Sequence, residues 1–140
     1  MDVELRFDCA GVDWTAVHGT LKRVGMGHFS PERHRQAFEA SRAAVFAYAC
    51  GRLVGFARAL SDGVCQAAIY DVAVVPEFQR QGIGAALVRA LLSRLEGLNV
   101  ILYASPGKED FYRKLGLRKM KTAMARFPDA EARAEKGFTE

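Results

Sequence analysis

Apolar positions along this chain recur with two spacings, every second residue or every third and fourth residue, and the spacing changes from one segment to the next. Val3, Leu5 and Phe7 alternate with polar residues and predict a first strand. The segment 14–24 carries apolar residues at helical spacing behind Asp13, a residue type that favours a helix N-cap. We therefore expect the chain to begin with a strand and a helix.

A second helix and three strands are expected next. The run SPER (30–33) combines a capping serine, a proline in the first turn and an acidic residue, which predicts a helix that ends near residue 41. The apolar runs AAVFAYAC and RLVGFARAL flank Gly51 and Arg52 and predict a β-hairpin. After a turn at 61–63, the run CQAAIYDVAVV predicts a third strand, antiparallel to the second.

The C-terminal half alternates between helical and extended patterns. Leucines between residues 85 and 96 have helical spacing, and Gly97 ends that pattern. The run VILYA (100–104) is short and continuously apolar, as in a strand that is buried on both faces. Residues 108–115 predict a short helix, and RKMKTAMARF (118–127) predicts a final strand.

The order β-α-α-β-β-β-α-β-α-β is typical of one α/β domain with a mixed sheet, which we assign to residues 1–127. Residues 128–140 are polar and are expected to form a frayed tail or a short surface helix.

Composition and charge narrow the classes of partner. Half of the residues are hydrophobic, 26% are charged, and the net charge is +4. This balance is typical of a soluble domain, and so small a charge gives little support for a nucleic-acid partner. The densest basic stretch, RKLGLRKMK (113–121), has apolar residues at every second or third position, as on the outer side of a packed helix and strand. We expect no nucleic-acid partner.

Cysteine and histidine usage argues against disulfides and metal. The chain has three cysteines without a C-x-x-C pair, and no histidine has zinc spacing to another histidine or cysteine. The start MDVELRFD does not resemble a signal peptide, and no apolar run approaches the length of a membrane span. We expect a cytoplasmic protein that binds neither a metal nor a membrane.

The segment QRQGIG (79–84) separates the third antiparallel strand from the leucine-rich helix. A dinucleotide fingerprint requires a third glycine where this chain has Leu87, and a P-loop requires Lys followed by Ser or Thr, which is missing after Gly84. Backbone N–H groups at a helix start can still hold a phosphate, and glycines permit its close approach. A helix entry without a ligand is the alternative.

The longer stretch VAVVPEFQRQGIGAALV (72–88) resembles the acetyl-coenzyme-A signature of the GCN5-related N-acetyltransferase (GNAT) family, Q/R-x-x-G-x-G/A. Gln79, Gly82 and Gly84 occupy its three specified positions. One helix and one strand later, FYRKLGL (111–117) is similar to the family's F-Y-x-x-x-G-F/L segment. The predicted order of elements also matches the family over residues 1–127.

This resemblance implies the GNAT fold, a mixed sheet of about six strands flanked by about four helices and splayed between the signature strand and the next strand. It also implies that signature-strand backbone groups pair with the pantetheine arm of acetyl-coenzyme A (acetyl-CoA), and that loop amides hold the pyrophosphate. The residues implied to bind the coenzyme are Val72, Ala73, Val74, Gln79, Arg80, Gln81, Gly82, Ile83, Gly84, Ala85, Phe111, Tyr112 and Lys114.

Attack of an amine on a thioester requires a base for the ammonium proton and a donor for the leaving sulfur. The resemblance places Tyr112 near that sulfur. A phenol of pKa about 10 is a weaker acid than a thiol of about 8.5, so Tyr112 acts better as a hydrogen-bond donor than by full proton transfer. Asp71 is the candidate base. The alternatives are that Asp71 is a structural partner, for example of Tyr70, and that ordered water carries the proton.

In this family the acceptor pocket is usually built by the first two helices, their connecting loop and the hairpin, which gives as candidate substrate residues His28, Phe29, Arg33 and Arg58. Arg58 could bind an acceptor carboxylate or phosphate, or it could pair with Asp62 or Asp71. His34 is expected on a helix surface.

We therefore expect an N-acetyltransferase that transfers an acetyl group from acetyl-CoA to a primary amine of a small molecule or peptide, by direct attack in a ternary complex. A non-catalytic coenzyme-A-binding sensor is the alternative. The acceptor is not readable from the sequence, because a fold does not fix its substrate. A homodimer is a further expectation, since a partner subunit could cover the last sheet edge.

Overall fold

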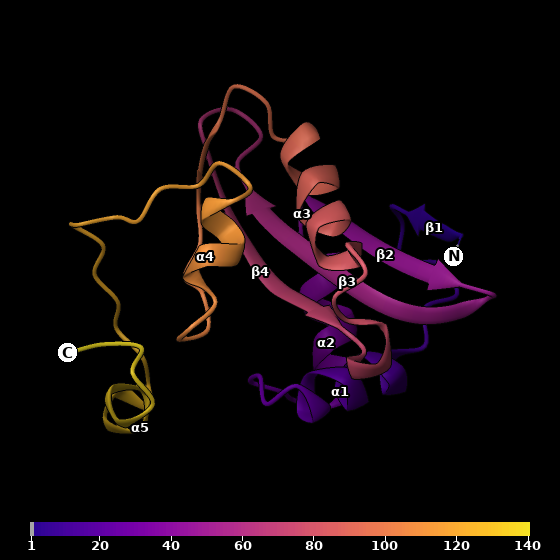
Figure 1. The fold of residues 1–140 in the computed structure, drawn as a ribbon, viewed down its shortest axis with the longest axis horizontal. Helices are drawn as coiled ribbons and strands as arrows, with labels where there is room; N and C mark the ends of the chain where they lie inside the picture. The colour runs from indigo at the N-terminus through magenta and orange to yellow at the C-terminus, as the bar shows by residue number, and fades with distance from the viewer. Residues whose placement is uncertain (1) are drawn as a thin grey trace. The chain divides into compact units, whose positions relative to one another are not determined.

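The computed structural model describes residues 2–140. They form two compact units, one that ends at Leu102 and one that begins at Tyr103 (Figure 1). Within the described part of the chain, no helix is both long and apolar enough to cross a membrane.

The first unit contains five strands, three α-helices and one 3₁₀ helix. In chain order they are β1 (Val3–Arg6), α1 (Trp14–Arg23), α2 (Pro31–Glu39), β2 (Ala43–Ala49), β3 (Arg52–Ser61), β4 (Gln66–Val74), η1 (Pro76–Phe78), α3 (Ile83–Ser93) and β5 (Asn99–Ile101). The strand β4 is the signature strand.

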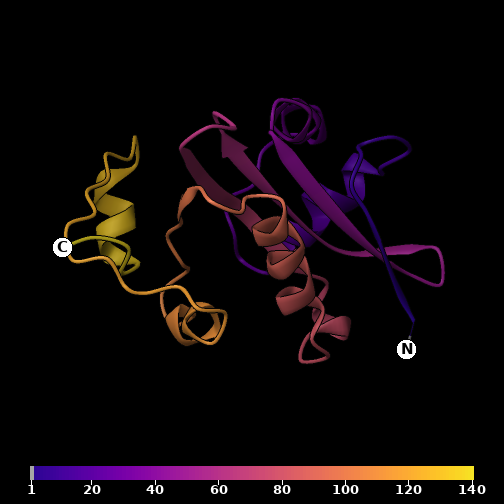
Figure 2. The ribbon, with the colours of Figure 1, turned by 90° about the horizontal axis from the view of Figure 1, so that it is seen from above.

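The five strands form one mixed sheet in the order β1-β2-β3-β4-β5. The pairs β1–β2, β2–β3 and β3–β4 are antiparallel, and the pair β4–β5 is parallel. Helices α1 and α2 cover one face of this sheet, and α3 covers the other face (Figures 1 and 2). The predicted α/β class, mixed sheet and element order through β5 are thus confirmed.

Each face of the sheet has its own apolar core. On the α1 and α2 face, Phe38 packs against Phe46 and Phe56 with ring centroids 5.4 and 5.8 Å apart. On the α3 face the helix approaches β3 closely at Gly55, where an added Cβ would lie 3.1 Å from Leu87 Cδ1. A glycine is therefore favoured at this position of β3, because an added side chain would force the Leu87 side chain or the neighbouring β4 backbone to shift.

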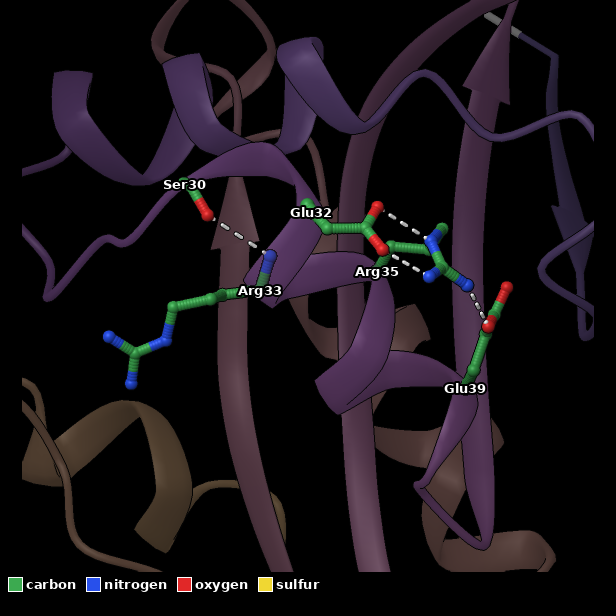
Figure 3. Close-up of polar contacts among 5 residues, drawn as sticks. All are labelled: Ser30, Glu32, Arg33, Arg35 and Glu39. Atoms are coloured by element: carbon green, nitrogen blue, oxygen red, sulfur yellow. Dashed lines mark hydrogen bonds and ion pairs between the residues drawn. The ribbon is translucent and has the colours of Figure 1, made fainter.

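The predicted helix starts and the hairpin are observed. Asp13 accepts a hydrogen bond from the Ala16 N–H at 3.1 Å, and Ser30 accepts one from the Arg33 N–H at 3.2 Å, so both residues cap their helices (Figure 3). The two turn residues of the hairpin lie one position earlier than predicted, at Cys50 (φ 49°) and Gly51 (φ 75°). Two successive positive φ angles are what a type I′ turn requires, because this turn matches the twist of the strands.

The second unit contains two short helices, α4 (Glu109–Arg113) and α5 (Ala130–Glu135). The rings of Phe127 and Phe138 lie 5.5 and 6.1 Å from that of Tyr103, and the Arg133 guanidinium lies over both phenylalanine rings. Of the two conformations expected for residues 128–140, the short helix is observed.

Two expectations for the C-terminal half are wrong. Residues 118–127 form no strand, and the described sheet has five strands, close to the number that the family resemblance implies. The strand expected at 100–104 is limited to Asn99–Ile101, and Ile101 is 49% exposed instead of buried. Apolar character alone does not fix a strand, because a strand also requires a neighbouring edge with which to pair.

Candidate active site

The sheet splays open between β4 and β5. These strands pair only through Gln66, Ala67 and Ala68, which face Asn99 to Ile101. From Ile69 to Val74, the described chain has no strand beside β4 on that side. The splay implied by the family resemblance is therefore present, and it leaves an open backbone edge on the signature strand.

The backbone of Val72 and Val74 faces this open edge. The Val75 N–H donates to the Val54 carbonyl of β3 at 2.8 Å. Backbone groups alternate sides along a strand, so those of Ala73 and Val75 point toward β3, and those of Val72 and Val74 point away from it. An extended ligand with amide groups can pair with such an edge as a further strand would.

The loop after β4 is tied to the end of that strand. Gln79 donates its side-chain amide to the Val74 carbonyl at 3.0 Å, so one open-edge acceptor is already used. This contact gives the first specified residue of the signature a local structural role. Arg80 adopts a positive φ of 63° and is exposed, as is Gln81. Among the described residues, no carboxylate lies within ion-pair distance of Arg80, and its charge is available to an anion.

The first turn of α3 presents unpaired backbone N–H groups. The Ala86 N–H donates to the Gly82 carbonyl at 3.0 Å, whereas the N–H groups of Ile83, Gly84 and Ala85 precede the first acceptor of the helix. No side chain caps this end. Gly82 has a φ of 83°, and no protein atom lies within 4 Å of an added Cβ there. This geometry fits the pyrophosphate of a coenzyme, which the N–H groups and the helix dipole favour.

Two cation contacts fix η1, which leads into this loop. Arg23 of α1 forms an ion pair with Glu77 at 2.6 Å, and the Arg52 guanidinium lies 5.3 Å from the centre of the Phe78 ring. The Arg23 contact is the main reason why the pKa of Glu77 lies below its ordinary value. The loop is therefore anchored to α1 and β3, although its tip is exposed.

A β-bulge places Asp71 beside Arg58. The pairing shifts by one residue between Phe56 and Arg58, so that Tyr70 and Ala73 lie on the same face of β4 although three positions separate them. Asp71 is the extra residue and has a φ of 56°. Aspartate tolerates this left-handed conformation better than most residues do, which explains its presence at the bulge.

Arg58 is bound by protein groups on the α1 and α2 face. Its Nε donates to Asp71 Oδ2 at 2.7 Å, and one terminal nitrogen donates to Ser41 Oγ at 3.3 Å. The guanidinium also lies 5.5 Å from the centre of the Tyr70 ring. Of the two roles open to Arg58, the structure shows the ion pair with Asp71. Asp62 instead accepts backbone hydrogen bonds from residues 64–66.

The loop between α1 and α2 brings three histidines together. The His18 ring lies 5.3 Å from that of His28 and 6.3 Å from that of His34. His34 is 3% exposed, which corrects the expectation that it lies on a helix surface. Burial is the largest cause that lowers its pKa below the ordinary value. The groups that face it come from α1, β3 and β4 as well as from the preceding loop, and the polar sequence of α2 gave no sign of this burial.

The candidate acceptor residues Phe29 and Arg33 form an exposed pair. Phe29 is 52% exposed, and the Arg33 guanidinium lies 4.0 Å from the centre of its ring. In α2, the carboxylates of Glu32 and Glu39 bind Arg35, and the Arg33 side chain points away from that group (Figure 3). Arg33 is therefore engaged with an aromatic ring rather than with an acidic neighbour.

In the second unit, the FYRKLGL segment forms α4 and its end. Leu117 N–H donates to the Tyr112 carbonyl at 3.1 Å, Gly116 N–H donates to the Arg113 carbonyl at 3.0 Å, and Gly116 has a φ of 94°. This is a Schellman motif, which requires the glycine of the family segment. Burial raises the pKa of Tyr112, and its ring lies 4.9 Å from that of Phe111. Lys114 is exposed.

The described residues contain no group of three or more His, Cys, Asp or Glu side chains arranged to hold a metal ion. The residues brought together in the first unit are those of the open β4 edge, the loop at 79–85, and the cluster of Arg58, Asp71 and the three histidines. Sequence reasoning missed His18, a member of this cluster, and Ser41, which accepts a hydrogen bond from Arg58. No sequence pattern marks them, since their partners are distant in the chain.

Comparison with known proteins agrees with this geometry. The sequence model of the acetyltransferase (GNAT) domain matches residues 16–126. Serotonin N-acetyltransferase 2, a chloroplastic protein of Oryza sativa, is 38% identical over 119 residues, which are 80% of this chain and 60% of the relative. This chain thus spans less than two thirds of the length of that curated relative.

Solved structures show the same fold. A protein of Deinococcus radiodurans assigned as an acetyltransferase is 28% identical with a TM-score of 0.79, over 94% of this chain and 92% of that one. A protein of Xanthomonas campestris assigned to the GNAT family is 26% identical with a TM-score of 0.80, over 91% of this chain and 94% of that one. Together with the match to the domain model, these likenesses show that the chain belongs to the GNAT family of acetyltransferases.

Proposed function

We propose that this acetyltransferase uses acetyl-CoA and acetylates a primary amine of a small molecule or peptide by direct attack in a ternary complex. One observation carries the proposal: the open edge of β4, with the backbone of Val72 and Val74 facing outward, leads into a helix start with unpaired N–H groups. The edge suits the amides of a pantetheine arm, and the helix start suits a pyrophosphate. Acetyl-CoA would supply the activated acetyl group.

Each proposed coenzyme contact uses a group described above. Val72 offers its N–H and carbonyl, Val74 offers its N–H because Gln79 already uses its carbonyl, and the N–H groups of residues 80–85 are proposed to hold the pyrophosphate. Arg80 adds a positive charge that the protein does not neutralise. By family resemblance, Lys114 or the Lys108 region is assigned to the terminal phosphates, and Phe111 is assigned to the coenzyme-binding residues.

Tyr112 is proposed to donate a hydrogen bond to the sulfur as it leaves. Burial raises the pKa of Tyr112, so the phenol keeps its proton at neutral pH. A group that holds its proton so firmly stabilises the thiolate by hydrogen bonding and not by full transfer. This is the role that Tyr112→Phe would remove.

Asp71 is the proposed base for the ammonium proton. Arg58 donates a hydrogen bond to its Oδ2 atom, and the Oδ1 atom would accept the proton from the ammonium group. The contact with Arg58 holds the carboxylate in one orientation, which a base needs. A relay of ordered water toward solvent is the alternative route.

The acceptor amine is proposed to lie near the loop between α1 and α2, beside Phe29, Arg33, Arg58 and His28. The rice relative is named a serotonin N-acetyltransferase, and a soybean relative is named a histone acetyltransferase. Serotonin and a lysine-containing peptide are therefore the first two acceptors to test. The exposed Phe29 ring offers an apolar contact that suits an aromatic amine.

The decisive experiment measures thiol release from acetyl-CoA with each acceptor, together with the mass of the acetylated product. We expect acceptor-dependent release with at least one amine, and a fall of roughly a hundredfold in kcat for Tyr112→Phe. Tight coenzyme binding in calorimetry without any release would favour the sensor instead. An absence of coenzyme binding would contradict both functions.

A further inference from the structure

Two histidine side chains hold the backbone of Phe29. His18 Nδ1 lies 2.6 Å from the Phe29 carbonyl oxygen, and a carbonyl can only accept, so His18 must carry its proton on Nδ1. The Phe29 N–H donates to His34 Nε2 at 2.9 Å, so that nitrogen carries no proton and the neutral His34 ring is protonated on Nδ1. The two contacts thus determine both tautomers.

The surroundings of His34 disfavour its positive charge. The groups that face it are Arg58 of β3, Asp71 of β4, His18 of α1 and His28 of the loop. Burial opposes the charged ring most, Arg58 and the other two imidazoles also oppose it, and only Asp71 favours it. His34 is therefore kept as a neutral acceptor at neutral pH.

The held residue is itself an exposed aromatic. The Phe29 side chain is 52% exposed, and its ring lies 5.9 Å from that of His34 and 4.0 Å from the Arg33 guanidinium. An exposed phenylalanine in a loop would ordinarily change its conformation freely. Here hydrogen bonds on both sides of its Cα atom restrain its backbone, so the position of the ring is restrained as well.

We propose that His18 and His34 are positioning residues that hold Phe29 as one wall of the acceptor site, and that a proton on His34 Nε2 opens this contact. We call His18, His34 and the Phe29 backbone the imidazole clamp. The proposal rests on the function proposed above, because it assigns the wall to the acceptor amine.

The proton acts directly on one hydrogen bond. When Nε2 gains a proton from solvent it becomes a donor, and it then faces the Phe29 N–H, which is also a donor. That contact breaks, and of the two histidine contacts to the Phe29 backbone only that of His18 remains. Acceptor binding should weaken on the acid side, whereas binding of acetyl-CoA through β4 and α3 should not.

Kinetics of matched variants test the effect on the acceptor. His34→Leu removes the acceptor atom and should raise the KM for the amine by about tenfold, with the KM for acetyl-CoA changed less than about twofold. His34→Gln keeps a neutral oxygen acceptor for the Phe29 N–H at every pH. Gln36→Leu is the control, because it makes a similar polar-to-leucine change at an exposed position of the same helix, α2.

The pH dependence separates the clamp from the titration of the amine itself. The KM for the amine of the wild type, divided by that of His34→Gln, should rise as the pH falls from about 8 to about 5.5, because only the wild type loses its acceptor when His34 is protonated. Titration of the amine itself cancels in this ratio, because it affects both proteins equally. A ratio that stays constant over this range would overturn the proposed opening. Equal effects of His34→Leu on both substrates would overturn the positioning role.

Nuclear magnetic resonance of the wild-type imidazoles tests the clamp without any activity. At pH 7.5 we expect Nε2 of His34 to be unprotonated and Nδ1 of His18 to be protonated. We also expect the Phe29 amide proton to exchange with solvent more slowly than the amide proton of His28. The opposite tautomer of either ring would overturn the clamp even if acetylation is observed. The expected tautomers in a protein that acetylates no amine would overturn the proposed function and leave the clamp intact.

Discussion

Arg58 and Asp71 form an ion pair of 2.7 Å in which the two side chains are only 16% and 21% exposed. Asp71 can reach Arg58 because a β-bulge adds one residue to β4 at this point, with a backbone conformation that aspartate tolerates. The pair lies among Tyr70, Ser41 and His34 on the face that α1 and α2 cover.

Removing one partner of this pair should destabilise the fold. Arg58→Met leaves a largely covered carboxylate without its cation, and we expect the free energy of unfolding to fall by about 2–4 kcal/mol. The double variant Arg58→Met with Asp71→Asn should recover part of that loss, because the unpaired charge is gone. Urea unfolding measures both changes. Arg6→Met is the control: its partner Glu4 is exposed, and a loss as large as that of Arg58→Met would contradict the role of burial.

Gly82→Ala should weaken coenzyme binding more than it weakens the fold. The positive φ of 83° strains any side chain by about 1–2 kcal/mol, but no protein atom lies within 4 Å of the added Cβ. We expect the KM for acetyl-CoA to rise about tenfold, because the methyl group would keep a phosphate from the amides of α3.

Gly97→Ala provides the matched control for that variant. Gly97 follows α3, has a φ of 80°, and likewise has no protein atom within 4 Å of an added Cβ. Thermal unfolding should show similar losses for the two variants, and only Gly82→Ala should change coenzyme affinity. Equal effects on affinity would mean that backbone strain, and not the proximity of the ligand, explains the result.

The pH profile of kcat should report the protonation of Tyr112. Burial raises its pKa above the ordinary value of about 10, so the phenol stays protonated and can donate throughout the neutral and mildly alkaline range. We expect no loss of kcat from this group between about pH 7 and 10. A fall of kcat in that window that Tyr112→Phe abolishes would contradict the assignment.

Stability should decrease in mild acid because of His34. Its pKa in the folded protein is lowered, so below about pH 6.5 the unfolded chain binds a proton that the folded chain resists. The contribution of the neutral His34 ring to the free energy of unfolding is fully retained above about pH 6.5, and it is lost as the pH falls toward the pKa of His34 in the folded protein. Urea unfolding between pH 8 and pH 5 should show a steeper decline for the wild type than for His34→Gln. Parallel declines would mean that other groups cause the effect.

The sequence predicted local elements well, because their determinants are local. Asp13 and Ser30 cap α1 and α2 as their residue types suggest, and the apolar runs within 43–74, separated by turn residues, form three adjacent strands. The strand expected at 118–127 failed for the opposite reason. Its four basic residues and scattered apolar positions permit an extended chain, but no described strand edge pairs with it.

The candidate site was predictable only in part. Signature residues identify the β4 edge and the loop, since the binding proposed there depends on backbone groups and on glycines at fixed spacing. The ion pair of Arg58 was among the alternatives that the sequence allowed. The imidazole clamp was not, because contacts among His18, Phe29 and His34 depend on the path of a loop, which residue types do not encode.

The bulge at Asp71 has a consequence for how such enzymes diversify. Beyond it, Phe56 still faces Ala73 in a regular ladder, and before it Arg58 faces Tyr70 in another. The bulge absorbs one extra residue, so the pairing on either side of it stays regular. A change of the proposed base at position 71 can therefore leave the proposed coenzyme edge at Val72 and Val74 undisturbed.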